Sequence, residues 1–391
     1  MTVLAAGRLV TGHEVHAPGW VDHHGGRILA VGPGRPSRID QDLADAVVVP
    51  GFVDMHVHGG GGGTFTTADP TSALLAVRAH QRRGTTTTMA SLVTASPEHL
   101  LASVSVLTEL VEADVVAGIH LEGPWISAHR CGAHDPTLLR EPDPDEIGRL
   151  LDAGRGAIRM VTIAPELPGA LDAIRQIVDA GAVAAIGHTD ADHDQVVSAI
   201  AAGARVATHL FNAMPPLHHR RPGPVLALLE DPRVTLELIA DGTHLAPATY
   251  RHISRTTGCG RVALITDAMA AATLGDGDHQ LGTLPVTVSD GVAHLTGTTT
   301  LAGSTTTMDQ LFRTAASEET GSHRGPVGAR DDISDAALLR AAQQTSGNPA
   351  RALGWSDVGI LQAGRQADLV VLDRLLNITD VIRNGESLSR G

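Results

Sequence analysis

The chain of 391 residues contains no lysine, so all 29 of its Lys-or-Arg residues are arginines. They are outnumbered by 43 acidic residues, and the formal net charge is -14 with histidine neutral. A chain this acidic is repelled by nucleic acid and by anionic membrane surfaces unless it carries a local basic patch. Because no run of arginines forms such a patch, we expect neither nucleic acid nor a membrane among its partners.

Cysteines, aromatic residues and long apolar runs are also scarce. Two cysteines, Cys131 and Cys259, are too few for a disulfide framework. Aromatic residues make up 2%, so the core must be built from Ala, Val, Leu and Ile. No segment reaches the ~18 apolar residues of a membrane span, and the first residues lack the basic and apolar regions of a signal peptide. We therefore expect a cytoplasmic protein.

The remaining composition is that of a folded protein, with 42% hydrophobic and 18% charged residues. Residues 1–50 form short apolar segments separated by turn signals such as Gly25-Gly26, and residues 357–391 show the same pattern. Neither end can bury a core alone. We predict that residues 1–50 and 357–391 together form a small β-sandwich domain, and that residues 51–356 form a separate domain.

That central region alternates apolar strands with helical segments, which predicts a parallel sheet covered on its outer face. The helical segments 171–181 and 194–204 have apolar residues at helical spacing and end near glycine. Eight strands close a TIM (β/α)8 barrel, so we predict an α/β fold of this type. The predicted strands are GFVDMHVH (51–58), TTTTMASLV (85–93), VVAGIHLEG (115–123), AIRMVTIAP (157–165), AVAAIGHT (182–189), ARVATHLFN (204–212), VTLELIADG (234–242) and RVALITDAM (261–269).

Polar residues appear at the C-terminal ends of these strands, where barrels of this type place their active sites. Polar residues with purely structural roles would be scattered along the strands instead. The residues at the strand ends are His56, His58, Glu122, Glu166, His188, His209, Asp241 and Asp267.

Two imidazoles and a carboxylate among them, His188, His209 and Glu122, supply the three protein ligands of a catalytic zinc site. His56-Val-His58 places two more imidazoles on one face of a strand, which also suits Zn²⁺ or Fe²⁺. The alternative is that each of these residues has only hydrogen-bonding partners. That alternative is reasonable for any one of them but poor for the whole set.

Asp267 follows the last strand, where a carboxylate next to a metal can accept a proton from water and return it to a leaving amine. The alternative role is to cap the following turn. A carboxylated lysine cannot bridge two metals here, which leaves Glu122 as the candidate shared ligand.

The glycine run Gly59–Gly63 lacks the lysine of a P-loop, and we predict a flexible loop there. Residues 321–332 are predicted to form an exposed insertion.

Taken together, the motifs resemble the N-acetylglucosamine-6-phosphate deacetylase family of the amidohydrolase superfamily. They occur in family order across almost the whole chain, and HLEGP with HLFNAM is hardly shared by other amidohydrolases. The resemblance implies hydrolysis of an acetamide on an amino-sugar phosphate, in amino-sugar catabolism and cell-wall recycling. The motifs are PGFVDMHVHG, HLEGPW, GAHDP, AIGHT, THLFNAMPPL, RRPG, DGTH, ITDAM and LAGS.

The same resemblance implies residue roles. Glu122, His188 and His209 would be the firm metal ligands, and Asp267 the catalytic acid and base. His134 would contact the substrate carbonyl and stabilise its oxyanion. The further substrate contacts implied are Ala133, Asn212, Ala213, Arg220, His244, Leu301, Ala302 and Gly303.

The resemblance also implies a divalent metal cofactor, with zinc first and iron, cobalt or manganese as alternatives. Members that keep the pair equivalent to His56 and His58 have capacity for a second ion, so we expect one or two ions per subunit. The family completes its phosphate pocket across a dimer interface. We therefore expect a homodimer in which Arg220 or His244 acts in the neighbouring subunit's site.

Two other interpretations are compatible with parts of the sequence. A dihydroorotase, hydantoinase or adenine-deaminase-like enzyme would share DMHVH and the terminal aspartate, although HLEGP and the missing lysine argue against most of these. A non-catalytic barrel that binds a sugar phosphate or a partner protein is a second class, but such proteins usually lose metal ligands that are all present here.

Overall fold

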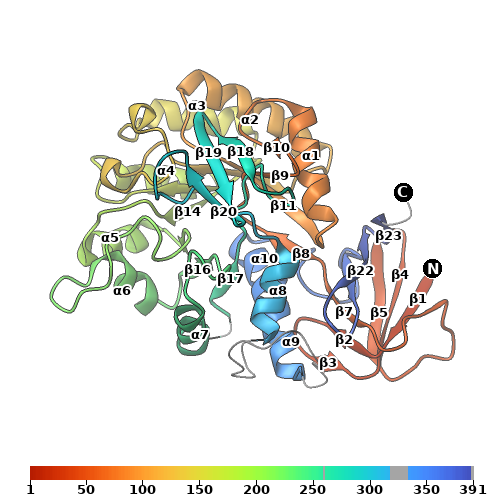
Figure 1. Cartoon of the computed structure of the whole chain (residues 1–391). Helices are drawn as coiled ribbons and strands as arrows, with labels where there is room; N and C mark the ends of the chain where they lie inside the picture. The colour runs from red at the N-terminus through yellow and green to blue at the C-terminus, as the bar shows by residue number, and fades with distance from the viewer. Residues whose placement is uncertain (259, 318–332, 389–391) are drawn as a thin grey trace.

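The computed structural model describes residues 1–258, 260–317 and 333–388. A large α/β barrel lies beside a smaller β-rich region that contains both chain ends (Figure 1). The predicted insertion at residues 321–332 lies outside the described residues. No helix in the described part of the chain is long and apolar enough to cross a membrane.

Within the described residues, the barrel is an eight-stranded parallel sheet in which each strand pairs with the next along the chain. The first and last strands are joined beyond their ends, where the Asp267 N–H donates to the His56 carbonyl at 2.9 Å. All eight strands lie inside the predicted segments, so the predicted TIM barrel is confirmed. The strands are β8 (Phe52–Asp54), β11 (Thr85–Leu92), β12 (Gly118–Glu122), β13 (Ile158–Ile163), β14 (Val183–Ile186), β15 (Val206–Ala207), β16 (Thr235–Leu238) and β17 (Val262–Leu264).

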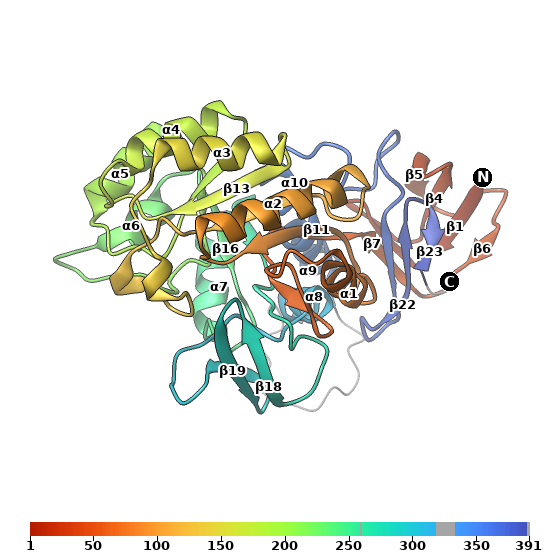
Figure 2. The ribbon, with the colours of Figure 1, turned by 90° about the horizontal axis from the view of Figure 1, so that it is seen from above.

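Helices follow the strands and lie around the barrel in Figure 1, and Figure 2 shows several of them along one side of it. Several begin with an acidic or hydroxyl residue before proline; Asp69, for example, accepts from the backbone N–H groups of Thr71 and Ser72. The helices are α1 (Pro70–Gln81), α2 (Pro97–Glu112), α3 (Pro144–Gly154), α4 (Ala170–Asp179), α5 (His193–Ala202), α6 (Gly223–Glu230), α7 (Pro247–Thr256), α8 (Met308–Ser317), α9 (Asp335–Ala342) and α10 (Asn348–Ala352), with the short 3-10 helices η1 (Ala128–Arg130) and η2 (Pro136–Leu138) and the π-helix η4 (Gln343–Gly347).

The barrel interior is filled mainly by non-aromatic side chains, as the scarcity of aromatic residues predicts. Met55, Met89 and Met160 are fully buried there, together with Ile239 and Ile265. Unbranched methionine side chains adapt to the irregular space at a barrel centre. A larger cluster of Leu, Ile, Val and Ala packs between the outside of the sheet and the helices, and it holds the strand ends in fixed positions.

The two chain ends form the predicted β-sandwich. β7 pairs antiparallel with β21, and a core that includes Leu4, Val48 and Leu369 lies between the two sheets. The domain boundaries at residues 50 and 356 stay a prediction. The strands are β1 (Thr2–Ala6), β2 (Arg8–Val10), β3 (Val15–His16), β4 (Gly19–His24), β5 (Arg27–Pro33), β6 (Gln41–Asp42), β7 (Val47–Pro50), β21 (Leu369–Leu372), β22 (Ile378–Arg383) and β23 (Glu386–Ser387).

Two small sheets lie near the C-terminal ends of the barrel strands. One is formed by β18 (Gly277–Leu281), β19 (Leu284–Ser289) and β20 (Val292–Leu295). The other is a tight hairpin of β9 (Gly59–Gly60) and β10 (Gly63–Thr64), so the predicted flexible glycine loop is wrong. The hairpin packs closely against α1, because a Cβ on Gly63 would lie 2.2 Å from the Ser72 carbonyl oxygen.

Candidate metal centre and active site

The predicted ligands converge at the C-terminal end of the barrel, but most lie just beyond their strands. Glu122 is the last residue of β12, whereas the other residues of the cluster follow the strands. His188, His209 and Asp267 have left-handed backbone conformations, with φ of 47°, 26° and 49°. Such conformations cost of order 1–3 kcal/mol for residues other than glycine and cluster at functional sites. Here they follow strand ends and place the side chains over the barrel.

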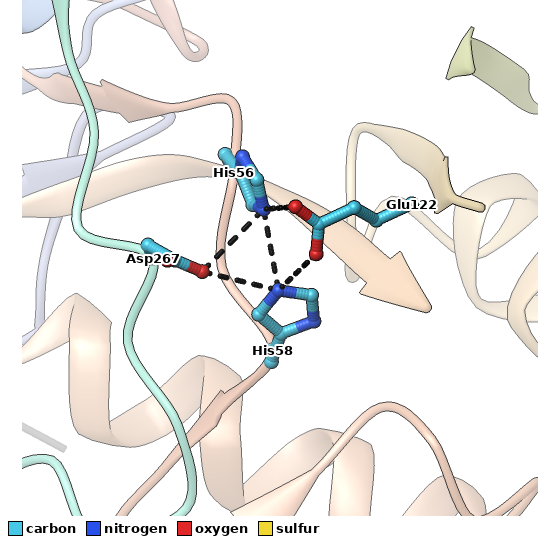
Figure 3. A group of neighbouring side chains, drawn as sticks. All are labelled: His56, His58, Glu122 and Asp267. Carbon is cyan, nitrogen blue, oxygen red and sulfur yellow. Dashed lines mark hydrogen bonds and ion pairs between the residues drawn. The ribbon is translucent and has the colours of Figure 1, made fainter. Parts of the chain in front are cut away.

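One group of side chains forms around His56 and His58, as Figure 3 shows. Their Nε2 atoms lie 3.2 Å apart. Nε2 of His58 is 3.1 Å from Glu122 Oε2 and 3.1 Å from Asp267 Oδ1. Nε2 of His56 is 3.5 Å from Glu122 Oε1 and from Asp267 Oδ1. All four side chains are buried, and they point their ligand atoms at one another, which is the arrangement of a metal site.

A second group forms on the other side of the same carboxylate. Glu122 Oε1 lies 2.9 Å from His209 Nε2 and 3.2 Å from His188 Nε2, and these two nitrogens are 3.0 Å apart. Oε1 of Glu122 also lies near His56, whereas Oε2 faces His58 and His134. The Glu122 carboxylate therefore contacts both groups of histidines.

Hydrogen bonds at Nδ1 fix the position of a ring proton in two of these histidines, His58 and His188. Nδ1 of His58 lies 3.1 Å from the Ser91 carbonyl, and Nδ1 of His188 lies 2.8 Å from the Arg130 carbonyl. Because a carbonyl oxygen can only accept a hydrogen bond, both Nδ1 atoms must carry protons. With the proton on Nδ1, Nε2 is the nitrogen that each ring presents to the cluster as a ligand atom. Metal-ligating histidines are oriented in this way, so the donor set fits a divalent cation.

The charges in the cluster depend strongly on one another. Burial alone would lower the pKa of His58, but Asp267 and Glu122 outweigh it and raise the pKa to about 9. Burial alone would raise the pKa of Glu122 and of Asp267, yet the neighbouring histidines hold both well below the usual range. Both carboxylates are therefore anionic at neutral pH, which suits them to bind a cation.

His134 has the opposite tautomer. Its Nδ1 accepts from the backbone N–H of Thr94 at 3.2 Å and lies 2.9 Å from the Thr94 hydroxyl, so the neutral ring carries its proton on Nε2. Nε2 faces Glu122 Oε2 at 3.4 Å. Desolvation by burial lowers the pKa of His134 to about 4, which keeps the ring neutral at pH 7. In this tautomer the Nε2–H of His134 points into the site, where His134 also forms a group of possible ligand atoms with Glu122 and His188.

Most of the predicted substrate contacts surround this centre. Asn212 donates to the His209 carbonyl at 3.2 Å, and the Ala213 carbonyl accepts from Thr189. Nδ1 of His244 lies 2.7 Å from Asp241 Oδ2. Burial would lower the pKa of His244, but Asp241 outweighs it and raises the pKa.

Two further segments carry predicted contacts. Ala133 is half-buried against the core beneath the β18–β20 sheet, and Ala302 is fully buried in that core. Residues 301–303 lie beside the segment after β17 that carries Asp267, because the N–H of the next residue, Ser304, donates to the Asp267 carbonyl at 2.7 Å. Leu301 and Gly303 are half-buried and remain accessible to a ligand.

Arg220 is a predicted substrate-binding residue that lies away from the cluster. It lies on an exposed loop, next to the bridge between His218 and Arg221. Among the described residues, no hydrogen bond or ion pair connects its side chain with the metal centre.

Sequence reasoning missed Glu237, a fully buried carboxylate that contacts His56 and His209. It also missed His120, which is fully buried and stacks edge-on against His56 at 4.5 Å between ring centroids. The available signal was a charged or titratable residue inside an apolar strand, as in Leu236-Glu237-Leu238. Both residues lie below the strand ends, where we expected only packing.

Comparison with known proteins agrees with this geometry. Residues 47–388 match the amidohydrolase family. The chain belongs to the amidohydrolase family. Among amidohydrolases, it is 35% identical to N-acetylglucosamine-6-phosphate deacetylase from Bacillus subtilis (strain 168) over 387 residues, 93% of this chain and 91% of that protein. It is 34% identical to N-acetylgalactosamine-6-phosphate deacetylase from Escherichia coli O157:H7 over 400 residues, 99% of each.

A solved structure supports the same placement within the amidohydrolases. N-acetyl-D-glucosamine-6-phosphate deacetylase from Mycobacterium smegmatis is 54% identical, with a TM-score of 0.94 over 99% of this chain and 98% of that one. That structure is of a mutant with one aspartate replaced by alanine, in complex with N-acetyl-D-glucosamine-6-phosphate. The resemblance predicted from the motifs is therefore confirmed at the level of the family.

Proposed function

We propose that this amidohydrolase hydrolyses the acetamide of N-acetyl-D-glucosamine 6-phosphate to D-glucosamine 6-phosphate and acetate, in amino-sugar catabolism and cell-wall recycling in the cytoplasm. The observation that carries the proposal is the buried carboxylate of Asp267, 3.1 Å from a metal-type histidine and in one cluster with Glu122. The relatives reported above act on the phosphates of two N-acetyl amino sugars.

We propose that Glu122, His188 and His209 hold one divalent ion, with zinc first, and that His56 and His58 allow a second ion that shares Glu122. When bound, such an ion supplies a Lewis acid that polarises water and the acetamide carbonyl. Zinc is favoured over magnesium or calcium because imidazole nitrogens outnumber carboxylate oxygens in the donor set.

The chain's own groups supply the proton transfers. Asp267 accepts a proton from the attacking water, and it later delivers that proton to the amine nitrogen as the C–N bond breaks. The neutral His134 donates its Nε2–H to the carbonyl oxygen as negative charge develops there. Because the donor is fixed by Thr94 before substrate binds, it needs no reorganisation during the reaction.

Acetate release tests this function. We expect fast release from N-acetylglucosamine 6-phosphate, slow release from unphosphorylated N-acetylglucosamine, and loss of both in chelator with recovery on adding zinc. If folded, metal-loaded protein turns over neither sugar, the proposed function is wrong, and a wider panel of cyclic amides and amidines becomes the next assay.

N-acetylgalactosamine 6-phosphate is a second candidate substrate, because the galactosamine-specific relative matches this chain over 99% of both lengths. The two sugars differ in the orientation of one hydroxyl but share the acetamide and the phosphate. Comparing kcat/KM for the two phosphates in the same assay decides between them.

We also propose a homodimer in which Arg220 binds the phosphate of the neighbouring subunit's substrate. The support is the exposed position of Arg220 away from its own metal centre, combined with the bidentate geometry that arginine offers to phosphate. Mixing Arg220→Ala with Asp267→Asn, after exchange of subunits, should restore turnover that neither variant has alone. If the mixture stays inactive while hybrid dimers form, Arg220 does not act across the interface.

A further inference from the structure

Glu237 is a carboxylate inside the barrel that the mechanism above does not use. It lies in β16, and its neighbours Leu236 and Leu238 belong to the core between sheet and helices. Because side chains alternate along a strand, Glu237 points the other way, into the barrel beneath the metal centre. Its side chain is fully buried.

One oxygen of Glu237 connects both groups of metal-type ligands. Oε2 lies 3.1 Å from Nδ1 of His56 and accepts from the backbone N–H of His209 at 3.2 Å. The Glu237 carbonyl also accepts from the Leu210 N–H at 2.9 Å. A single side chain thus orients the first histidine of the His56-Val-His58 pair and the backbone of a ligand in the other group.

No arginine pairs with Glu237 among the described residues, and its second oxygen, Oε1, has no hydrogen-bond partner there. A buried carboxylate is costly unless an opposite charge offsets it. His56 contacts Glu237 through Nδ1. A cation at Nε2, on the far side of the ring, would be supported by the charge of Glu237 through this hydrogen bond.

We propose that Glu237 is the positioning residue of the His56-Val-His58 metal position, which it prepares for a second divalent ion. Its carboxylate holds the His56 proton on Nδ1, directs the Nε2 lone pair toward Glu122 and Asp267, and makes the imidazole a stronger ligand. Carboxylate partners of this kind typically account for a 10–100-fold change in metal affinity. This inference rests on the proposed metal dependence, and it names Glu237 as the carboxylate that supports binding of the second ion.

The test is zinc binding to Glu237→Gln, measured by calorimetry and by metal content after dialysis. The amide oxygen can still accept from His56 and from His209, so the variant removes the charge and little else. We expect the second ion to bind about 10–100-fold more weakly, while the first ion remains tightly bound. In wild-type protein with isotope-labelled histidine, the His56 Nδ1–H should give a slowly exchanging NMR signal that shifts upfield in the variant.

Asp368→Asn is the matched control. Asp368 is a buried carboxylate that accepts from the Asn384 N–H at 2.7 Å, in the β-sandwich and without contact with the cluster. This control should bind both ions as the wild type does. Glu237→Asp keeps the charge but shortens the side chain, and it should also weaken the second ion because the carboxylate no longer reaches His56.

Unchanged affinity for two ions in folded Glu237→Gln would overturn the proposal, as would a wild-type protein that binds only one. If Glu237→Gln does not fold, Glu237→Asp decides in the same way. Since zinc binding is measured without substrate, these results are independent of whether the proposed sugar phosphate is deacetylated.

Discussion

Histidines of one site take different roles according to the atom that contacts Nδ1. The rings of His58 and His188 donate Nδ1–H to carbonyl oxygens and so present Nε2 as a ligand. The ring of His134 accepts at Nδ1 from the Thr94 N–H and so presents a donor. The nitrogen that carries the proton in a neutral ring is therefore set by backbone groups, which do not ionise.

Replacing Asp267 with asparagine should remove most of the turnover. The amide keeps the shape of the side chain but can neither accept nor deliver the proton, and general acid–base catalysis typically contributes 10²–10⁴-fold. We expect kcat to fall by about this factor while the circular dichroism spectrum and the zinc bound at His188 and His209 are retained. Near-normal kcat in the metal-loaded variant would show that Asp267 is not the acid and base.

Replacing His134 with alanine should lower kcat with little effect on metal content. Removing one oxyanion donor typically costs about 10²–10³-fold in kcat. Glutamine can offer an N–H from a similar distance, so His134→Gln should recover part of this loss. If His134→Ala instead loses a metal ion while kcat per bound ion is unchanged, His134 is a ligand and its assignment as a donor is wrong.

The pair of His244 and Asp241 predicts a pH dependence of substrate binding. Because Asp241 raises the pKa of His244, the imidazole keeps its positive charge to a higher pH than an ordinary histidine. If His244 contacts the phosphate, KM should rise as the pH increases through this raised pKa. In Asp241→Asn the rise should begin at lower pH, since the asparagine oxygen still caps the turn but the charge is gone. A KM profile with the same midpoint in both proteins would contradict this role.

At the scale of elements, the segment after β17 is held against residues 301–304. The Ser304 N–H donates to the Asp267 carbonyl at 2.7 Å, and the Met269 N–H donates to the Ser304 carbonyl at 2.9 Å. Gly303 has a left-handed φ of 62°, and a Cβ there would lie 2.8 Å from the Asp267 carbonyl oxygen. The resemblance predicted that Gly303 contacts the ligand, and its packing gives a second reason for glycine at this position.

Gly303→Ala should therefore impair catalysis through the backbone of Asp267. The added methyl group must push that backbone or distort the 301–304 segment, and small displacements of a catalytic group can cost about 10²-fold in rate. We expect kcat to fall more than metal affinity. Gly291→Ala is the control, because a Cβ at Gly291, also at positive φ, meets open space. Equal kinetics in the two variants would argue against the packing explanation.

At the scale of the whole molecule, the barrel gathers three carboxyl side chains around one buried cluster. Glu122, Glu237 and Asp267 are brought there from β12, β16 and the segment after β17, which also bring the hydrophobic core together. Such a cluster links metal binding to folding, because the unfolded chain cannot offer the same ligands.

Chelation should lower the melting temperature of the whole protein. An ion present at 100 times its dissociation constant stabilises the folded state by about 2.7 kcal/mol. We expect the melting temperature to fall in chelator and to return when zinc is added, as followed by differential scanning calorimetry. Glu122→Gln should show little response to either treatment. A wild-type melting temperature independent of metal would contradict a tightly bound structural and catalytic ion.

The sequence predicted most of the fold because its signals are local. Apolar runs such as residues 157–165 and glycine-terminated helical segments repeat along the chain, and the eight strands lie inside them. The prediction of a flexible loop after His58 was wrong. The tight hairpin there depends on close packing against α1, and local sequence patterns do not report such contacts. Local patterns also located Glu122, His188 and His209, since each stands where an apolar strand ends.

The sequence by itself determined the barrel, the acidic net charge and the residue types available as ligands. Only the tertiary structure decided which nitrogen of each histidine carries a proton, that Glu122 lies between two groups, and that Glu237 contacts His56. These features depend on contacts between residues as far apart in sequence as 56 and 237. Periodicity describes which face a side chain takes on its own strand, whereas distances between strand ends are fixed only when the barrel closes.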